Sequence, residues 1–308
     1  MRDGPILLIG ANGQVGGEAL PLLDALGDVV SLSRAEMDLS NSASIRSAVR
    51  QLKPRWIINA AAYTAVDQAE SAFEAAFAVN RDAPGVLGEE ACRIGAPVIH
   101  FSTDYVFAGD GTRPWDEEDP TGPLGVYGES KLAGERALAA SGAAHLIFRT
   151  SWVYGTHGKN FLLTILKLAR EREELRIVND QYGAPTWSRT LAQLVAHSVL
   201  RSESQAHQNG ITLSEAVCPI SGIYHACSAG VTTWFGFASE FVRLAQRAHP
   251  EQAFATLIPV PSTAYPTPAR RPQNSRMNCE KLTRTLGFEM PTWQQSTSLV
   301  MDELTSQT

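Results

Sequence analysis

The stretch of sequence that decides the fold reads ILLIGANGQVGGEAL and covers residues 6–20. Its apolar start predicts a buried strand over Ile6–Gly10, and glycines follow at positions 10, 13 and 16. Glycine permits a tight turn, lets the backbone approach a pyrophosphate and lets the next helix pack close to the sheet. A helix over Gly16–Ala25 would then offer free N–H groups to phosphates. The spacing favours a dinucleotide-binding turn over an ordinary glycine-rich connection.

The first half of the chain alternates short apolar runs with patterns of helical period. The expected strands are Ile6–Gly10, Val29–Ser33, Trp56–Ala60, Pro97–Thr103 and His145–Ser151. The expected helices between them are Gly16–Ala25, Ser42–Leu52, Ala72–Cys92 and Ser130–Ala140. The strands are apolar throughout, as they are when helices cover both faces of a sheet. This alternation predicts an α/β fold with a doubly wound parallel sheet of the Rossmann type.

The second half of the chain has a less regular pattern. It predicts the helices Phe161–Arg172, Arg189–Arg201 and Trp234–Ala248 and a strand over Leu175–Asp180. Residues 202–221 are polar without a clear period, which predicts a surface loop, and the prolines of residues 259–272 favour extended chain. We expect residues 1–150 to form an NAD(P)-binding domain and residues 151–308 mainly a smaller, mixed α/β substrate lobe. Segments such as 175–200 are candidates to return to the core domain.

Composition excludes several classes of protein. The 308 residues carry 26 Lys and Arg against 32 Asp and Glu, a formal charge of −6 that argues against nucleic acid as a partner. The four cysteines are scattered without a Cys-x-x-Cys pair, which favours reduced thiols over a zinc cluster or a disulfide framework. The apolar run at Pro5–Ile9 is too short for a signal peptide or a membrane span. We expect a soluble, cytoplasmic protein with no membrane partner.

The end of the second expected strand bears on cofactor choice. NAD-dependent enzymes usually place an acidic residue there to hold the ribose 2′-hydroxyl, whereas arginine suits a 2′-phosphate. Here the strand ends in Ser33 and Arg34, and the first acids are Glu36 and Asp38. Ser33 and Arg34 can both donate to a 2′-phosphate. The sequence therefore predicts a preference for NADPH, with NADH tolerated; the alternative is that Arg34 is only a solvated loop cation.

A Tyr-x-x-x-Lys pair, Tyr127 and Lys131, begins the expected helix after the fourth strand. Residues four apart share a helix face, so phenol and ammonium can address one ligand. A nearby cation favours the phenolate, which lets Tyr127 give a proton to a carbonyl oxygen as hydride arrives at carbon. The fourth strand ends in Thr103, at the sheet edge where ligands bind. Its hydroxyl can hydrogen-bond the carbonyl, and the three residues together predict a reductase, although the Tyr/Lys pair alone is a weak signal.

With these motifs in order, the chain resembles the extended short-chain dehydrogenases/reductases and, among them, the dTDP-4-dehydrorhamnose reductase family. The matching segments are the glycine turn with Gln14, Asn59–Ala62, Ser102–Phe107, Tyr127–Lys131, Phe148–Tyr154, Asn179–Thr186 and Arg271–Ser275. The resemblance implies reduction of the C4 keto group of dTDP-4-dehydro-β-L-rhamnose to dTDP-L-rhamnose. A dTDP-linked 4-keto-6-deoxyhexose is therefore the expected substrate. Ser33 and the long 202–221 segment depart from the family's pattern.

The motifs and the resemblance together give the expected site. The catalytic residues are Thr103, Tyr127 and Lys131. The expected cofactor-binding residues are Gly10, Asn12, Gly13, Gln14, Val15, Gly16, Ser33, Arg34, Asp38, Leu39, Ala61, Ala62, Tyr63, Thr64, Phe101, Tyr127 and Lys131. The expected substrate-binding residues are Thr103, Asp104, Trp152, Arg270 and Arg271. The two arginines suit a diphosphate because guanidinium binds it bidentately, the alternative being surface ion pairs. Trp152 would stack on the ligand or, alternatively, serve as a core aromatic.

Some alternatives stay open at this point. Related dehydratases carry Glu after the Ser-Thr-Asp motif, where this chain has Tyr105, and an epimerase would return the hydride to the opposite face of the sugar. A regulatory subunit of methionine adenosyltransferase resembles the same family and would bind NADP without catalysis. Some members use Mg²⁺ at a dimer interface, which makes Glu18 a candidate ligand in a homodimer. A solvated helix carboxylate is the simpler interpretation of Glu18, so no metal ligand is assigned.

Overall fold

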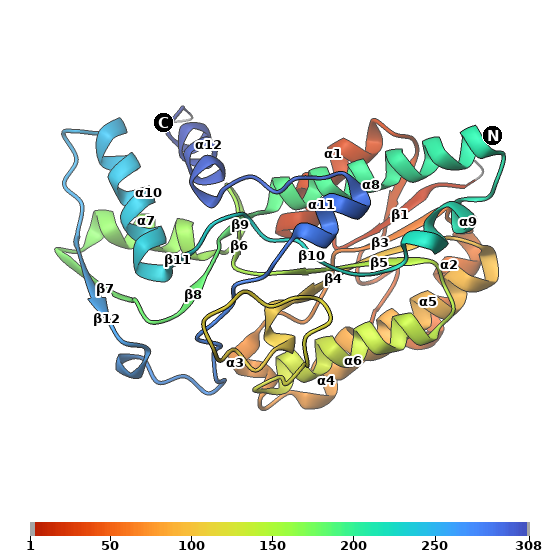
Figure 1. Ribbon diagram of the computed structural model, residues 1–308, viewed down its shortest axis with the longest axis horizontal. Helices are drawn as coiled ribbons and strands as arrows, with labels where there is room; N and C mark the ends of the chain where they lie inside the picture. The colour runs from red at the N-terminus through yellow and green to blue at the C-terminus, as the bar shows by residue number, and fades with distance from the viewer. Residues whose placement is uncertain (1–3, 307–308) are drawn as a thin grey trace.

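The centre of the molecule is a six-stranded sheet in which all neighbouring strands are parallel (Figure 1). The computed structural model describes residues 4–306. The strand order is β10-β5-β4-β3-β1-β2, with bounds Ile6–Ile9 (β1), Val29–Ser31 (β2), Trp56–Asn59 (β3), Val98–Thr103 (β4), His145–Thr150 (β5) and Gly222–His225 (β10). The order reverses between β1 and β3, and ligands bind outside the carboxyl ends of strands at such a switch point. The predicted doubly wound fold is confirmed.

Helices cover both faces of this sheet, as the apolar strands require (Figure 1). One face carries α1 (Gln14–Asp24), α8 (Ser188–Asn209) and α11 (Glu280–Leu286), and the other carries α2 (Ser42–Leu52), α5 (Ala83–Ile94) and α6 (Val126–Ala140). Each face has its own apolar core: Leu8 and Leu191 belong to the first, and Leu7 and Leu87 to the second. Adjacent residues of β1 therefore enter opposite cores, which explains why the strand is apolar throughout.

The expected helix Ala72–Cys92 consists of three pieces. They are α4 (Phe73–Phe77), a π-helical turn (Ala78–Asp82) and α5. Pro84 lies in the first turn of α5, where its missing N–H costs least. The wider turn before it holds the buried Asn80, whose side chain bonds both backbone groups of Tyr63. A π-turn at this point thus serves a side chain that fixes the groove-lining loop after β3.

The prediction of a surface loop over residues 202–221 is wrong. Helix α8 continues to Asn209 and ends at Gly210 with φ +63°, and α9 (Leu213–Val217) follows with a Thr212/Glu215 capping box. A short 3₁₀ turn completes the segment at Cys218–Ile220. Small residues such as Ser202 and Ala206 face the core. Because these side chains are short or polar, the buried face of the helix shows no apolar period.

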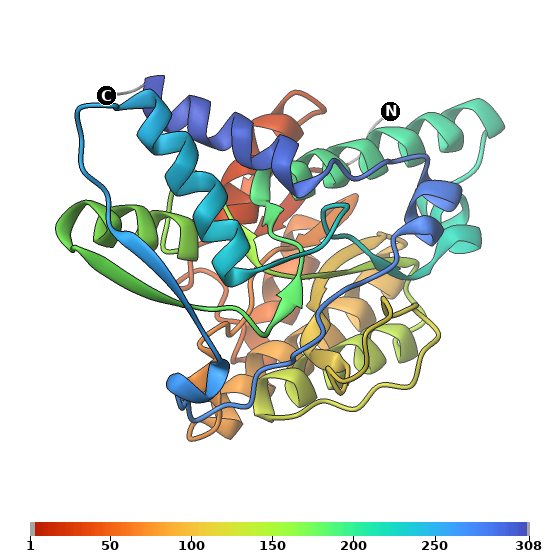
Figure 2. The same ribbon diagram turned by 60° about the vertical axis from the view of Figure 1, so that its left-hand side comes forward.

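A second lobe stands beside the sheet and has its own apolar core (Figure 2). Its main elements are α7 (Phe161–Glu171), β7 (Glu174–Val178), α10 (Trp234–Ala248), β12 (Thr256–Val260) and α12 (Trp293–Ser306). Strands β7 and β12 pair in parallel over five residues. Short pieces complete the fold: α3 (Val66–Ala69), β6 (Val153–Tyr154), β8 (Tyr182–Gly183), β9 (Thr186–Trp187) and β11 (Thr232–Thr233). No helix between residues 4 and 306 is long and apolar enough to cross a membrane.

The chain crosses between the two units several times after residue 150. Helix α8, which packs on α1, and strand β10, which pairs with β5, both belong to the sheet unit. Helix α11 packs there as well, whereas α10, β12 and α12 lie in the second lobe. Two of these connections leave the carboxyl ends of sheet strands, after Thr150 of β5 and after His225 of β10.

A buried ion pair joins the sheet to helix α6. Arg149 on β5 donates from Nε and Nη2 to the two carboxylate oxygens of Glu135 at 2.9 and 2.7 Å. Both side chains are at most 2% exposed. Such a pair contributes little net stability, but removal of one partner leaves the other charge buried without a counter-ion.

We predict that Arg149→Met destabilises the fold by about 3–5 kcal/mol, because it leaves the Glu135 carboxylate buried and unpaired. Urea unfolding measures the loss. The control is Arg149→Met combined with Glu135→Leu, which removes both charges and should recover most of the lost stability. A single variant as stable as wild type would show that the pair does not fix α6 on the sheet.

Candidate active site

The turn after β1 is shaped for close approach of a ligand. Gly10 has φ +85°, a conformation that side chains disfavour, and a Cβ on Gly16 would overlap the carbonyl oxygen of Gly10. Gly13 is the residue before α1, so the free N–H groups of that helix begin at Gln14 and Val15. The Gln14 side chain points away and accepts from Asn160 Nδ2 at 3.0 Å, at the start of α7. Gln14 thereby ties the turn to the second lobe.

A groove of about 680 Å³ runs along the switch point between β1 and β3. Nine expected cofactor residues line it: Gly10, Asn12, Ser33, Arg34, Asp38, Leu39, Ala61, Ala62 and Tyr63. Gly13–Gly16 are not among its lining residues but lie at the start of α1, Thr64 follows Tyr63, and Phe101 lies on β4. Glycine backbone, helix N-terminus and apolar walls are what a dinucleotide needs, so the residues present fit that cofactor.

One detail of this groove differs from the sequence interpretation. Glu36 folds back onto Ser33, whose hydroxyl and N–H donate to the Glu36 carboxylate at 2.7 and 2.8 Å. These bonds lower the pKa of Glu36, so a carboxylate does stand at the end of β2. Arg34 is exposed, with its Nε 3.8 Å from Asp38 Oδ1. The strand end therefore presents both an acid and an arginine.

Helix α6 begins one turn earlier than predicted, which places Tyr127 in its first turn. The carboxylate of Glu70 accepts from the N–H of Val126 at 3.0 Å and caps this end. Burial raises the pKa of Tyr127 to about 12, and the Thr103 hydroxyl opposes this by hydrogen bonding. The phenol is thus protonated near neutral pH, and it lies beside the Thr103 hydroxyl at the end of β4.

Lys131 lies one turn further along α6 and is fully buried. Its Nζ donates to the carbonyl oxygen of Phe101 at 2.6 Å and lies 3.3 Å from His100 Nε2. Burial lowers the pKa of Lys131 to about 8, with Glu135 acting in the opposite direction. Phe101 thus enters the site through its backbone.

Asp104 follows Thr103 and is buried as well. The Thr103 hydroxyl donates to Asp104 Oδ1 at 3.0 Å. Burial raises the pKa of Asp104 to about 6, against the lowering effects of the Ser275 and Thr103 hydroxyls. Thr103, Asp104, Tyr127 and Lys131 therefore gather where β4 meets α6, and three of them have strongly shifted pKa values.

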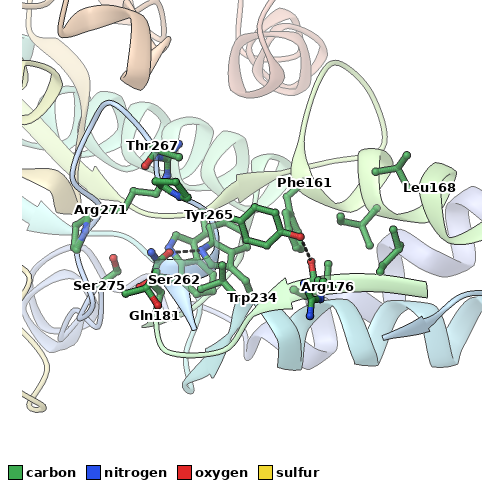
Figure 3. A pocket seen from close by; sticks show the side chains of 18 of the residues that line it. Phe161, Leu168, Arg176, Gln181, Trp234, Ser262, Tyr265, Thr267, Arg271 and Ser275 are labelled. Atoms are coloured by element: carbon green, nitrogen blue, oxygen red, sulfur yellow. Dashed lines mark hydrogen bonds between the residues drawn. The ribbon is translucent and has the colours of Figure 1, made fainter. Parts of the chain in front are cut away.

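A cavity of about 1020 Å³ opens next to this cluster, between the second lobe and Tyr105 (Figure 3). Trp152, Arg270 and Arg271, for which the sequence predicts substrate binding, line this cavity. Trp152 stacks on Trp234 with ring centroids 3.8 Å apart, and its φ of +50° is unusual for a side-chain-bearing residue. A plain core aromatic would need no such backbone, so the conformation favours a ligand-facing role.

The two arginines differ in their partners. Arg271 is half-buried and donates to both oxygens of Asp67, at 3.1 Å from Nη1 and 2.9 Å from Nη2. Arg270 is exposed at the cavity rim. Arg270 is therefore available to a ligand, whereas Arg271 combines the ion-pair role with its place in the cavity wall.

Glu18 is neither solvated nor part of a metal site in the described chain. It is buried and accepts from Arg189 Nε at 2.7 Å, and Arg189 Nη1 also donates to Glu303 at 2.7 Å. Between residues 4 and 306 no three His, Cys, Asp or Glu side chains are grouped to hold a metal ion. The interpretation of Glu18 as a solvated carboxylate is wrong, and Arg189 satisfies its charge.

Several cavity residues escaped the sequence interpretation: Phe161, Gln181, Trp234, Ser262, Tyr265 and Ser275. Figure 3 shows Trp234 Nε1 donating to Gln181, and Tyr265 donating to the carbonyl of Arg176. Gln181 and Ser275 lie inside segments that carried the family resemblance, so a signal existed for them. Trp234 and Tyr265 come from distant segments with no motif, and only the packing of the lobe brings them together.

Comparisons with known proteins agree with this geometry. A protein from Burkholderia thailandensis named dTDP-4-dehydrorhamnose reductase is 46% identical over 305 residues, covering 98% of this chain and 99% of that one. A dTDP-4-dehydrorhamnose reductase structure from Clostridium acetobutylicum has a TM-score of 0.86 at 32% identity, covering 97% and 99%. The Bacillus anthracis enzyme of that name, in complex with NADP, has a TM-score of 0.85 at 30% identity, with the same coverage.

The parallel sheet, the glycine turn and the Tyr127/Lys131 pair define an extended short-chain dehydrogenase/reductase. Within that class, the family model described as the RmlD substrate binding domain matches residues 4–306. The chain belongs to this family.

Proposed function

We propose that the chain reduces the C4 keto group of dTDP-4-dehydro-β-L-rhamnose to dTDP-L-rhamnose, with NADPH as the hydride source. The observation that carries this proposal is the meeting of Tyr127, Thr103 and Lys131 where β4 meets α6, beside a large aromatic-lined cavity whose wall residue Tyr105 contacts the Tyr127 ring. Relatives that match nearly the whole chain bear the corresponding name, and one of them binds NADP. A soluble, cytoplasmic setting accords with a nucleotide-sugar substrate.

Tyr127 is the proton donor in this proposal. Its pKa near 12 keeps the phenol protonated near neutral pH. NADPH, when bound, supplies the hydride to C4, and the O–H of Tyr127 gives its proton to the developing alkoxide. The Thr103 hydroxyl, beside Tyr127, would turn from Asp104 Oδ1 to donate to the same carbonyl oxygen. A cation at Lys131 favours the phenolate left behind.

The cavity accounts for the rest of the substrate. The Trp152–Trp234 stack offers an aromatic surface to a sugar or base ring, and Arg270 offers a guanidinium to the diphosphate. We assign Asp104, whose carboxylate accepts from the Thr103 hydroxyl, a contact with a sugar hydroxyl. These are the roles that we assign to the expected substrate residues.

Simple reduction is favoured over dehydration by the residue after Asp104. Water elimination needs an acid/base pair, and Tyr105 supplies no carboxylate there. Burial raises the pKa of Tyr105 above its ordinary value, so its phenol stays protonated. Tyr105 instead lines the cavity and meets the Tyr127 ring edge-on, with centroids 5.4 Å apart. Its role is to shape the pocket around the proton donor.

We predict that Tyr127→Phe lowers kcat by about 10²–10⁴, because the ring stays and only the proton donor is lost. The assay is NADPH oxidation with dTDP-4-dehydrorhamnose as substrate, beside a direct measurement of NADPH affinity. The control is Tyr105→Phe, which removes a phenol of the same cavity that we assign no proton transfer and should keep most activity. A Tyr127→Phe enzyme with wild-type kcat would contradict the assignment.

Glu36 and Arg34, which follow β2, predict how the enzyme distinguishes a 2′-phosphate from a 2′-hydroxyl on the cofactor. The Glu36 carboxylate repels a 2′-phosphate and accepts from a 2′-hydroxyl, whereas Arg34 attracts the phosphate. Glu36→Gln should therefore raise the ratio of kcat/KM for NADPH to that for NADH several-fold, and Arg34→Ala should lower it. Steady-state kinetics with both cofactors measures the ratio. If wild type uses the two cofactors equally and neither variant changes the ratio, the NADPH preference is wrong.

A further inference from the structure

A chain of buried polar side chains joins Lys131 to the end of β3. Lys131 Nζ lies 3.3 Å from His100 Nε2, and His100 Nδ1 lies 3.1 Å from Asn59 Nδ2. The Asn59 Oδ1 atom accepts from the backbone N–H of Ala61 at 3.3 Å. All three side chains are at most 2% exposed. The proposed reduction uses neither His100 nor Asn59, so this polar chain needs another explanation.

The backbone fixes the direction of the hydrogen bonds. The N–H of Ala61 can only donate, so it orients Oδ1 of Asn59 toward itself and leaves Nδ2 facing His100. The Nδ1 atom of His100 must then accept. Burial holds the pKa of His100 well below its usual value, so the ring is neutral. A neutral ring that accepts at Nδ1 carries its proton on Nε2, and that N–H faces Lys131.

This arrangement fits the uncharged amine of Lys131 better than the ammonium. An ammonium has three N–H groups and no lone pair, so it sets a donor against the Nε2–H of His100. The amine accepts from Nε2–H with its lone pair and still donates to the Phe101 carbonyl. The other imidazole tautomer only moves the conflict to Asn59. Every contact in the polar chain is therefore satisfied only when Lys131 has lost its proton.

Few other charged groups act on Lys131. Glu135, one turn along α6, favours the ammonium, but Arg149 already binds both of its oxygens. Tyr127 precedes Lys131 on the same helix, and the charge of Asp104 raises the pKa of the Tyr127 phenol. His145, on the neighbouring strand β5, also lowers the pKa of His100. None of these groups offers Lys131 the lone pair that an ammonium would need in place of the His100 N–H.

We propose that His100, oriented by Asn59, is a positioning residue that favours loss of the Lys131 proton. Loss of this proton then sets the pH above which the rate of the reduction falls. The proposal rests on the proposed function. When Tyr127 has given its proton to the sugar oxygen, an N–H of the Lys131 ammonium returns one to the phenolate. The neutral amine that results accepts from His100 Nε2–H and regains a proton from water before the next turnover.

The test reverses the polarity of the polar chain with Asn59→Asp. One carboxylate oxygen keeps the Ala61 hydrogen bond, and the other accepts from His100 Nδ1–H. The proton leaves Nε2, whose lone pair then accepts from the Lys131 ammonium. The alkaline limb of kcat/KM, expected in wild type near the Lys131 pKa of about 8, should move up by about one pH unit or more. An unmoved limb overturns the proposal.

A double-mutant cycle separates this effect from the added negative charge. In a His100→Leu background, Asn59→Asp has no ring through which to act, so its shift should largely disappear. An equal shift in both backgrounds would mean plain charge attraction and would overturn the role of His100. Should His100→Leu fail to fold, His100→Gln replaces it as a direct variant. Its amide can turn a carbonyl oxygen toward Lys131, so the limb must again rise, and a wild-type limb overturns the proposal.

A second readout does not depend on turnover. The ammonium of Lys131 attracts anionic NADPH, so NADPH affinity, followed by its fluorescence, should weaken above the same pH limb in wild type. Asn59→Asp should move that limb upward as well. If wild type binds NADPH but does not reduce the keto sugar, the proposed substrate is wrong, while the binding titration still decides the role of His100. A pH dependence identical in wild type and Asn59→Asp contradicts that role.

Discussion

The hydrogen bond from Lys131 Nζ to the carbonyl oxygen of Phe101, 2.6 Å long, fixes helix α6 against strand β4, and the site depends on it. It sets the depth at which Tyr127 meets Thr103, because all four residues belong to these two elements. The bond lies in a buried environment, where a hydrogen bond is stronger and an unsatisfied group costs more. One short contact thereby fixes the geometry of proton transfer.

The rest of the fold supports that contact from both sides. The Arg149–Glu135 pair joins the next turn of α6 to β5, and Glu70 caps the helix at Val126. Gln14 and Asn160 connect the glycine turn to the second lobe. Because the cavity wall residue Tyr105 packs against the Tyr127 ring, these links also hold the cavity in a defined relation to Tyr127. Burial of the same residues shifts their pKa values, so packing and chemistry have a common origin.

The sheet and its helices follow from sequence because their signals are local. The glycine spacing at residues 10–16 and the apolar strands need no distant contact to be read. The failures share a different cause: α8 hides a buried face of small and polar residues such as Ser202, and Glu36 reaches Ser33 through a turn of the backbone. The fold likewise brings the Sγ atoms of Cys227 and Cys279 within 3.6 Å. No spacing rule anticipates such contacts.

The substrate side of the site is the least readable from sequence. Trp152 stands in a recognisable segment, but its stacking partner Trp234 lies 82 positions later in an element with no motif. The neutral tautomer of His100 depends on a backbone N–H of another strand end. Both features arise where three or more segments meet, and the sequence of one segment does not predict which other segments it contacts.

The central claim is a net hydride transfer from NADPH to C4 of the sugar. Its most direct test is turnover of dTDP-4-dehydrorhamnose with NADPH dideuterated at C4 of the nicotinamide, followed by NMR of the product. The account predicts dTDP-L-rhamnose with one deuterium at sugar C4 and one NADPH oxidised per product formed. A changed sugar without deuterium, or turnover without net NADPH oxidation, would contradict it and indicate an epimerase or dehydratase instead.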